Sequence, residues 1–269
     1  MPPAPPSLDG LSVRPPARPP ALLSFANVGR RYPDGGREIV ALEGVSFELQ
    51  AGAAVGVYGA RRSGKSTLLR LAAAIESPDA GVVRFAGRDV TRISSRERSR
   101  LLRSSVAFLT SAGWLASPGE TVLDHVAMSL GSEGLTMREA KRRALLALDV
   151  VGVAALGAEE LTASLSLGER ARVMLARALV REPRLLIVDE PAPMPSVGER
   201  ERFCAILRTV SGERGIALLI ASEDMATLRG VGALMSISAG ALCSPEERGT
   251  VAGTVSQLRP RRAAASGHA

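Results

Sequence analysis

The chain has 269 residues, which suits one large α/β domain or two small ones with a substantial core. Hydrophobic residues make up 46% of it, yet no apolar run reaches the roughly 18 residues of a membrane-spanning helix. The two cysteines, Cys204 and Cys243, lie far apart and indicate neither a disulfide framework nor a metal site, so we expect reduced thiols. The net charge of +7 is partly concentrated in the two ends, so no nucleic-acid partner is expected.

The chain begins with a proline-rich and alanine-rich leader, residues 1–21, which we expect to be disordered. Apolar residues then predict strands at 22–28 and 41–49, with a turn at 33–36 between them. A further short apolar run at 53–58 predicts a buried strand, which leads into the first functional motif.

That motif is a complete phosphate-binding loop, G-x-x-x-x-G-K-S, between the strand at 53–58 and a helix predicted at 67–75. Its glycines let backbone N–H groups wrap phosphates, Lys65 would reach the β- and γ-phosphates, and Ser66 would ligate Mg²⁺. The alternative is a chance turn between strand and helix. The predicted nucleotide contacts here are Gly59, Ala60, Arg61, Arg62, Ser63, Gly64, Lys65, Ser66 and Thr67.

The middle of the chain alternates strands and helices. Another strand is predicted at 81–87, and a charged helical start follows at 94–100. After a strand at 105–110, helical composition covers 121–130 and 136–151.

A helix at 168–180 precedes a buried strand, residues 185–190, that ends in Asp189 and Glu190. Open α/β sheets bind ligands at the carboxyl ends of their strands, so Asp189 is predicted to hold Mg²⁺ and Glu190 to polarise an attacking water. The alternative is a strand that ends in a solvated acidic turn. A strand at 217–223 and short strands at 233–242 complete the predicted sheet.

The segment Leu165-Ser166-Leu167-Gly168-Glu169, followed by a helix, resembles the signature of ATP-binding-cassette (ABC) ATPases, L-S-G-G-Q. Tyr32 is similar in placement to the aromatic residue on which that family stacks adenine. The stretch from residue 87 to 126 looks most similar to the lipoprotein-release and macrolide-efflux subgroup.

The resemblance implies an α/β fold in which a P-loop core sheet carries an N-terminal antiparallel β-subdomain and an inserted helical subdomain. The expected domain spans 22–253, with the helical part at about 111–165 and a disordered basic tail at 254–269. The family binds ATP and Mg²⁺, and two such domains dimerise head to tail. Each ATP would then lie between one P-loop and Ser166 and Gly168 of the other subunit, with a multi-span permease as membrane partner. This places the chain in the cytoplasm, on the inner face of the cell membrane.

The chain departs from the family pattern at several catalytic positions. Thr110 stands where the family has a Gln that approaches Mg²⁺ and water, and Glu223 where it has a His that contacts the γ-phosphate. Ser196 replaces an Asp after a proline-rich loop, and Leu167 replaces the first signature glycine. We therefore expect nucleotide binding to be retained and hydrolysis, with Glu190, Thr110 and Glu223 as catalytic positions, to be slow or confined to a partner's site.

Two other functions stay open. A non-transport member of the superfamily could act on ribosomes or DNA, although this chain has neither the second cassette nor the coiled-coil insertion usual there. A regulatory ATP-binding subunit without catalysis would differ from a transporter subunit only in showing no turnover with its membrane partner.

Overall fold

The computed structural model describes residues 20–110, 113–117, 119–131, 133–153, 157–191 and 196–243. Most of the predicted leader, the whole predicted tail and the loop at 192–195 lie outside these residues. The expectations made for those segments therefore stay predictions.

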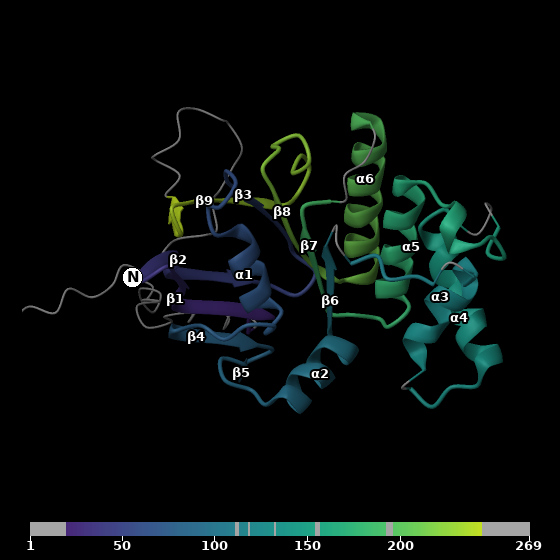
Figure 1. Cartoon of the computed structure of the whole chain (residues 1–269), viewed down its shortest axis with the longest axis horizontal. Helices are drawn as coiled ribbons and strands as arrows, with labels where there is room; N and C mark the ends of the chain where they lie inside the picture. Colours follow the sequence, from purple (N-terminus) through teal and green to yellow (C-terminus); the bar gives the residue numbers. More distant parts are fainter. Residues whose placement is uncertain are drawn as a thin grey trace, which may run out of the picture.

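A mostly parallel sheet forms the centre of the described residues, with strand order β10-β9-β3-β8-β7-β6 (Figure 1). Its strands are β3 (Ala54–Tyr58), β6 (Val106–Thr110), β7 (Leu185–Asp189), β8 (Ala217–Ser222), β9 (Ala233–Ser238) and β10 (Ala241–Cys243). All run parallel except β10, which pairs antiparallel with β9. Residues 185–188 are buried on both faces because parallel strands are covered on each side, which explains why they read as one apolar run.

The two faces of this sheet belong to two hydrophobic cores. Leu186 and Val188 pack in the core that includes the helices of the second half of the chain. Leu185 and Ile187 point the other way, into a core shared with the helix after the P-loop and with the second sheet. The alternation follows from the two-residue period of a strand, and it packs β7 between the two cores.

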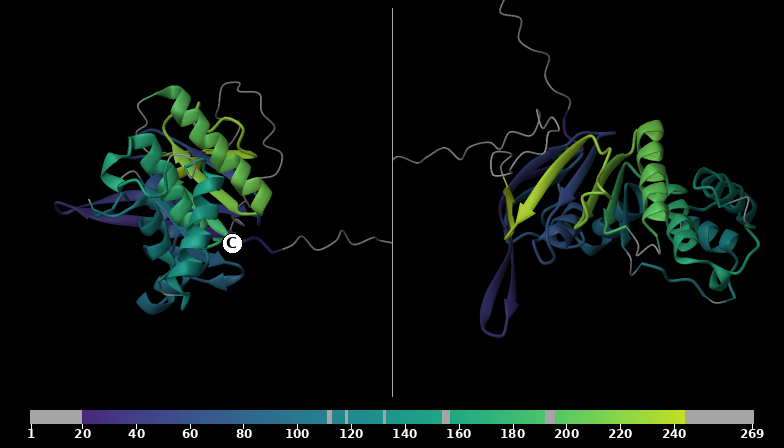
Figure 2. Two further views of the ribbon diagram at one scale, coloured as in Figure 1. Left: turned by 90° about the vertical axis from the view of Figure 1, so that its right-hand side faces the viewer. Right: turned by 90° about the horizontal axis from the view of Figure 1, so that it is seen from above.

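The second sheet is antiparallel, with order β2-β1-β4-β5. Its strands are β1 (Leu23–Asp34), β2 (Arg37–Leu49), β4 (Ala80–Phe85) and β5 (Arg88–Asp89). β1 and β2 are longer than predicted and project as a hairpin (Figure 2). The predicted turn at 33–36 was too wide, because Pro33 and Asp34 still pair with β2 and only Gly35 and Gly36, with φ of 54° and 90°, form the turn.

The helices are α1 (Lys65–Ala72), α2 (Ser95–Ser104), α3 (Val122–Ala127), α4 (Met137–Val150), α5 (Leu167–Leu179) and α6 (Val197–Arg214), with short 3₁₀ turns η1 (Met128–Leu130) and η3 (Thr162–Ser164). α3, α4 and α5 pack together beside the β6 edge of the sheet (Figure 1). The sequence did not predict α6, in which buried Phe203 and Leu207 belong to one unbroken apolar run, residues 203–207, and buried Val210 follows one turn later. The architecture is the predicted α/β class.

Within the described ranges, no helix combines the length and the apolar character that a membrane span requires.

Candidate nucleotide-binding site

The phosphate-binding loop is fully formed at the N-terminus of α1. Gly64 caps the helix with a φ of 108°, and a side chain there would lie 2.4 Å from the carbonyl oxygen of Ala41, so only glycine fits. Lys65 is buried, and its Nζ donates hydrogen bonds to the carbonyl oxygens of Gly59 (2.8 Å) and Ala60 (2.9 Å). The ammonium group is thus held inside its own loop, where the helix dipole also favours an anion.

The groups around this loop fit a polyphosphate. The hydroxyl of Ser63 is buried and has no hydrogen-bond partner within the described part of the chain. Arg61 and Arg62 are exposed on the loop, and the first turn of α1 contains no acidic residue. The loop therefore offers donors and positive charge without a built-in carboxylate on α1 to oppose phosphate.

Two residues of the predicted metal site, Ser66 and Asp189, are hydrogen-bonded to each other. The Ser66 hydroxyl donates to Oδ1 of Asp189 at 3.1 Å, joining the start of α1 to the end of β7. Thr110 pairs with Asp189 in the parallel register of β6 and β7, so its side chain starts from the same edge of the sheet. Hydroxyl and carboxylate oxygens are the ligands that Mg²⁺ prefers, so these residues fit a magnesium ion.

Glu190 lies one residue beyond β7 because its φ of 51° takes the chain out of the extended region. Its Oε2 accepts a hydrogen bond from the Ser222 hydroxyl (3.0 Å) and its Oε1 accepts one from the backbone N–H of Glu223 (2.8 Å). Lys65 Nζ is 3.8 Å from the same Oε1. Both carboxylate oxygens are therefore engaged by the end of β8, next to the phosphate-binding lysine.

Glu223 and Thr110, which stand where the family has other catalytic residues, differ in their surroundings. Glu223 contacts Glu190 through its backbone N–H, and its side chain is exposed. Thr110 lines a small, mostly apolar cavity of about 10 Å³ together with Glu190 and Met174.

The signature-like segment forms the N-terminus of α5. Ser166 is the N-cap, where its hydroxyl accepts from the N–H of Glu169 (3.3 Å) and its own N–H donates to the Glu169 carboxylate (2.8 Å). Leu167 is 47% exposed and Gly168 is buried. Among the described residues, no hydrogen bond or ion pair connects Ser166 or Gly168 with the P-loop.

Tyr32 lies in β1 and approaches the helix after the P-loop. Its hydroxyl donates to the carboxylate of Glu76 and is 3.5 Å from the hydroxyl of Thr67 on α1. The guanidinium of Arg30 lies over the Tyr32 ring, 4.8 Å from its centroid. The predicted base-stacking residue is thus on the same side of the molecule as the phosphate-binding helix and in contact with it.

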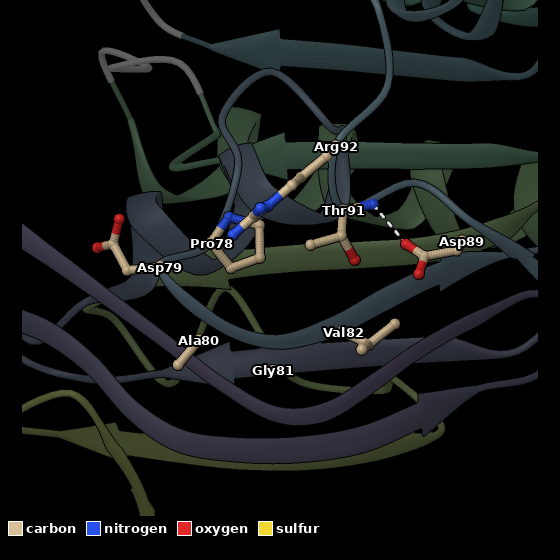
Figure 3. Close-up of a pocket in the computed structure, with 8 residues that line it drawn as sticks. All are labelled: Pro78, Asp79, Ala80, Gly81, Val82, Asp89, Thr91 and Arg92. Atoms are coloured by element: carbon tan, nitrogen blue, oxygen red, sulfur yellow. Dashed lines mark hydrogen bonds between the residues drawn. The ribbon is translucent and has the colours of Figure 1, made fainter.

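A surface hollow of about 430 Å³ lies elsewhere, between β4 and the segment after β5 (Figure 3). Asp79 stands at one end and Asp89 at the other, where the Asp89 carboxylate accepts from the N–H of Thr91 at 2.8 Å. Hydrogen bonds from Thr91 lower the pKa of Asp89. No predicted site residue lines this hollow, and its acids are already hydrogen-bonded, so we assign it no role in nucleotide binding.

Comparison with known proteins agrees with this geometry. The family model described as "ABC transporter" matches residues 42–193, which is more than half of the chain. The chain belongs to the ABC transporter family. The match runs from β2 through the P-loop and the signature-like segment to the residues just after Glu190.

The relatives of this ABC protein are ATP-binding subunits. It is 32% identical over 222 residues to the lipoprotein-releasing system ATP-binding protein LolD of Pseudomonas syringae pv. tomato, which covers 82% of this chain and 97% of the relative. LolD 2 of Caulobacter vibrioides is 34% identical over 82% of this chain and 96% of its own length. The methionine import ATP-binding protein MetN of Rhizobium etli is 33% identical, also over 82% of this chain but over only 59% of its own length.

A solved dimer of the ATP-binding cassette MJ0796 bound to ADP and Pi aligns with a TM-score of 0.74 at 24% identity, covering 82% of this chain and 96% of that one. At that identity the likeness shows the fold alone. The relatives confirm the prediction of an ABC transporter ATP-binding subunit, an ATPase of the transport-coupled class, near the lipoprotein-release subgroup.

Two residues that contact predicted site residues were not predicted. The first is Ser222, which ends β8 and lies beside the end of β7, where it contacts Glu190. The sequence signal for it was a hydroxyl residue at the carboxyl end of a neighbouring strand. The second is Glu76, for which the sequence has no comparable signal, because its contact with Tyr32 depends on how β1 lies against the end of α1.

Proposed function

We propose that this chain binds Mg·ATP with the phosphates on the P-loop and the metal at the end of β7, and that this binding drives a membrane partner while hydrolysis at its own site is slow. The observation that carries the proposal is the direct contact between Ser66 and Asp189 beside a preformed loop around Lys65. The protein groups proposed to bind the phosphates and the metal thus lie next to one another in the structure.

Each residue has a definable part in this proposal. Lys65 would exchange the carbonyl oxygens of Gly59 and Ala60 for phosphate oxygens, which carry full charge and bind an ammonium more strongly. Ser66 and Asp189 would hold Mg²⁺, which neutralises phosphate charge when bound. Arg61, Arg62, Ser63, Gly64 and Thr67 would surround the phosphates from the loop and the first turn of α1.

Slow hydrolysis follows from what surrounds Glu190. This carboxylate is the candidate to accept a proton from water, yet in the structure it accepts two hydrogen bonds from the end of β8. Thr110 and the exposed Glu223 offer no donor of the reach that Gln and His would have. Losing one preorganised donor typically costs roughly 3 kcal/mol, or about 10²–10³ in rate, so two such losses would leave little turnover.

The site is proposed to be completed by a second cassette. Ser166 is exposed at the start of α5, and within the described ranges no hydrogen bond or ion pair joins it to the P-loop, so a second subunit would supply this surface to the nucleotide. A homodimer or a pairing with a competent sister both satisfy this need. The boundaries 22–253, the permease partner and the location on the inner face of the cell membrane belong to this proposal, since the relatives are named as subunits of transport systems.

Phosphate release from Mg·ATP by the purified protein tests the catalytic part. We expect slow turnover for the unaltered chain and an increase of about 10²-fold or more for the double variant Thr110→Gln with Glu223→His. Adding Glu190→Gln to that double variant is the control and should abolish the gain. No increase in the double variant would refute the attribution to these two positions.

The two alternatives are separated by their partners. Salt-sensitive binding of nucleic acid, with no stimulation by a membrane protein, would favour a ribosome- or DNA-acting ATPase. Mg·ATP binding without any turnover, even in the presence of the permease, would favour a regulatory subunit.

A further inference from the structure

Glu76 lies just beyond the end of α1 and contacts side chains from two separate parts of the fold. Its carboxylate accepts the hydroxyl of Tyr32 and lies 3.5 Å from Nε of Arg30, both on β1. Its other oxygen accepts a hydrogen bond from Arg70 of α1 at 3.2 Å. The Glu76 side chain is only 21% exposed, so these contacts are partly shielded from water.

These contacts fix the orientation of the Tyr32 ring. The hydroxyl is held by Glu76, and Arg30 covers one face of the ring at 4.8 Å. Arg30 is itself held, because its Nη1 donates to Oδ1 of Asp79 at 2.9 Å. An aromatic base can therefore stack only on the opposite face of the ring.

The same network joins the ring to the phosphate-binding helix. Arg70 and Thr67 belong to α1, whose first residue is Lys65, and both lie within hydrogen-bond range of the Glu76–Tyr32 pair. The distance between the Tyr32 ring and the P-loop is therefore constrained by the contacts of Glu76.

We propose that Glu76 is a positioning residue for the nucleobase: it holds Tyr32 so that the free ring face stands at the correct distance from the P-loop. The inference rests on the proposed function, since it assumes that Tyr32 stacks the base of the bound nucleotide. Glu76 should govern the part of the affinity that depends on the base and leave the part that depends on phosphate unchanged.

The test compares the dissociation constants of Mg·ATP and Mg·tripolyphosphate by calorimetry. For Glu76→Ala we expect Mg·ATP to bind roughly five- to tenfold more weakly, the effect of about one hydrogen bond, and Mg·tripolyphosphate to bind as before. Tyr32→Phe removes the same hydrogen bond from the other side and should give the same selective loss. The double variant should lose no more than either single one.

Glu38→Ala is the matched control, because Glu38 is an exposed acid on the same hairpin that pairs with Arg31 at 3.4 Å. It should change neither dissociation constant. Equal weakening of both ligands by Glu76→Ala, or no weakening of Mg·ATP, would overturn the inference. If Glu76→Ala is unfolded by circular dichroism, the result for Tyr32→Phe decides in the same way. An unaltered chain that binds neither ligand would instead refute the proposed function, and the inference with it.

Discussion

Acid should destabilise this protein through one buried histidine. His125, on α3, is 2% exposed, and its Nε2 lies 3.1 Å from Nη1 of Arg177 while its Nδ1 lies 2.9 Å from Oε2 of Glu120. A guanidinium can only donate, so Nε2 must accept and Nδ1 must carry the proton that is donated to Glu120. The neutral imidazole therefore satisfies both neighbours, with the Trp114 ring packed 5.1 Å away.

Protonation would place a second proton on Nε2, facing Arg177. Burial, reinforced by the positive charge of Arg177, lowers the pKa of His125 despite the opposing hydrogen bond to Glu120. The unfolded chain, with a histidine pKa of about 6.5, therefore takes up the proton first as the pH falls. The histidine's contribution to stability is present at neutral and higher pH and declines as the pH drops below about 6.5.

The size of this contribution follows from what His125→Ala removes. Two hydrogen bonds to charged partners and a buried ring are lost, for which we expect a destabilisation of about 3 kcal/mol at pH 8. Urea unfolding of the unaltered chain and of His125→Ala at pH 8, 7, 6 and 5 measures it, since other titrating groups, including His268, are common to both proteins. The difference in the free energy of unfolding should shrink toward pH 5. A difference that stays constant or grows would refute the lowered pKa of His125.

Further predictions concern the two ends of the proposed nucleotide site. Lys65→Ala should weaken Mg·ATP binding by roughly 30- to 1000-fold, because about 2–4 kcal/mol of attraction to phosphate is lost, as calorimetry would show. Ser166→Ala should lower the free energy of unfolding by about 1 kcal/mol through loss of the α5 cap, and Ser94→Ala at the start of α2 provides the equivalent capping-box comparison. Leu167→Gly should promote dimerisation in Mg·ATP, measured by light scattering, if its exposed side chain obstructs the second subunit; an unchanged mass would contradict that role.

Local patterns were enough to predict the core of the fold. The strand at β7 could be predicted because four consecutive apolar residues before Asp189 are typical of a parallel strand that is buried on both faces. The P-loop could be predicted because its glycines stand where the backbone leaves no room for a side chain, as the structure shows at Gly64. α6 was missed because the unbroken apolar run at 203–207 obscures the helical period of its buried positions.

Contacts between distant segments could not be predicted in this way. Glu76 and Tyr32 are 44 positions apart, and nothing in either local sequence says that they meet. The same holds for Ser222 and Glu190, 32 positions apart, which meet because β7 and β8 are neighbours in the sheet. The hydrogen bond from the backbone of Glu223 to Glu190 was missed for the same reason, and the catalytic role of Glu223 stays a prediction.

The central claim is that the P-loop and the end of β7 together hold Mg·ATP. Calorimetric titration of the full chain with ATP, in Mg²⁺ and then in EDTA, alongside Asp189→Asn, tests it most directly. The account predicts one ATP bound per chain in Mg²⁺, with affinity reduced at least tenfold by EDTA and by the substitution. Absence of binding, or equal affinity under all three conditions, would contradict it.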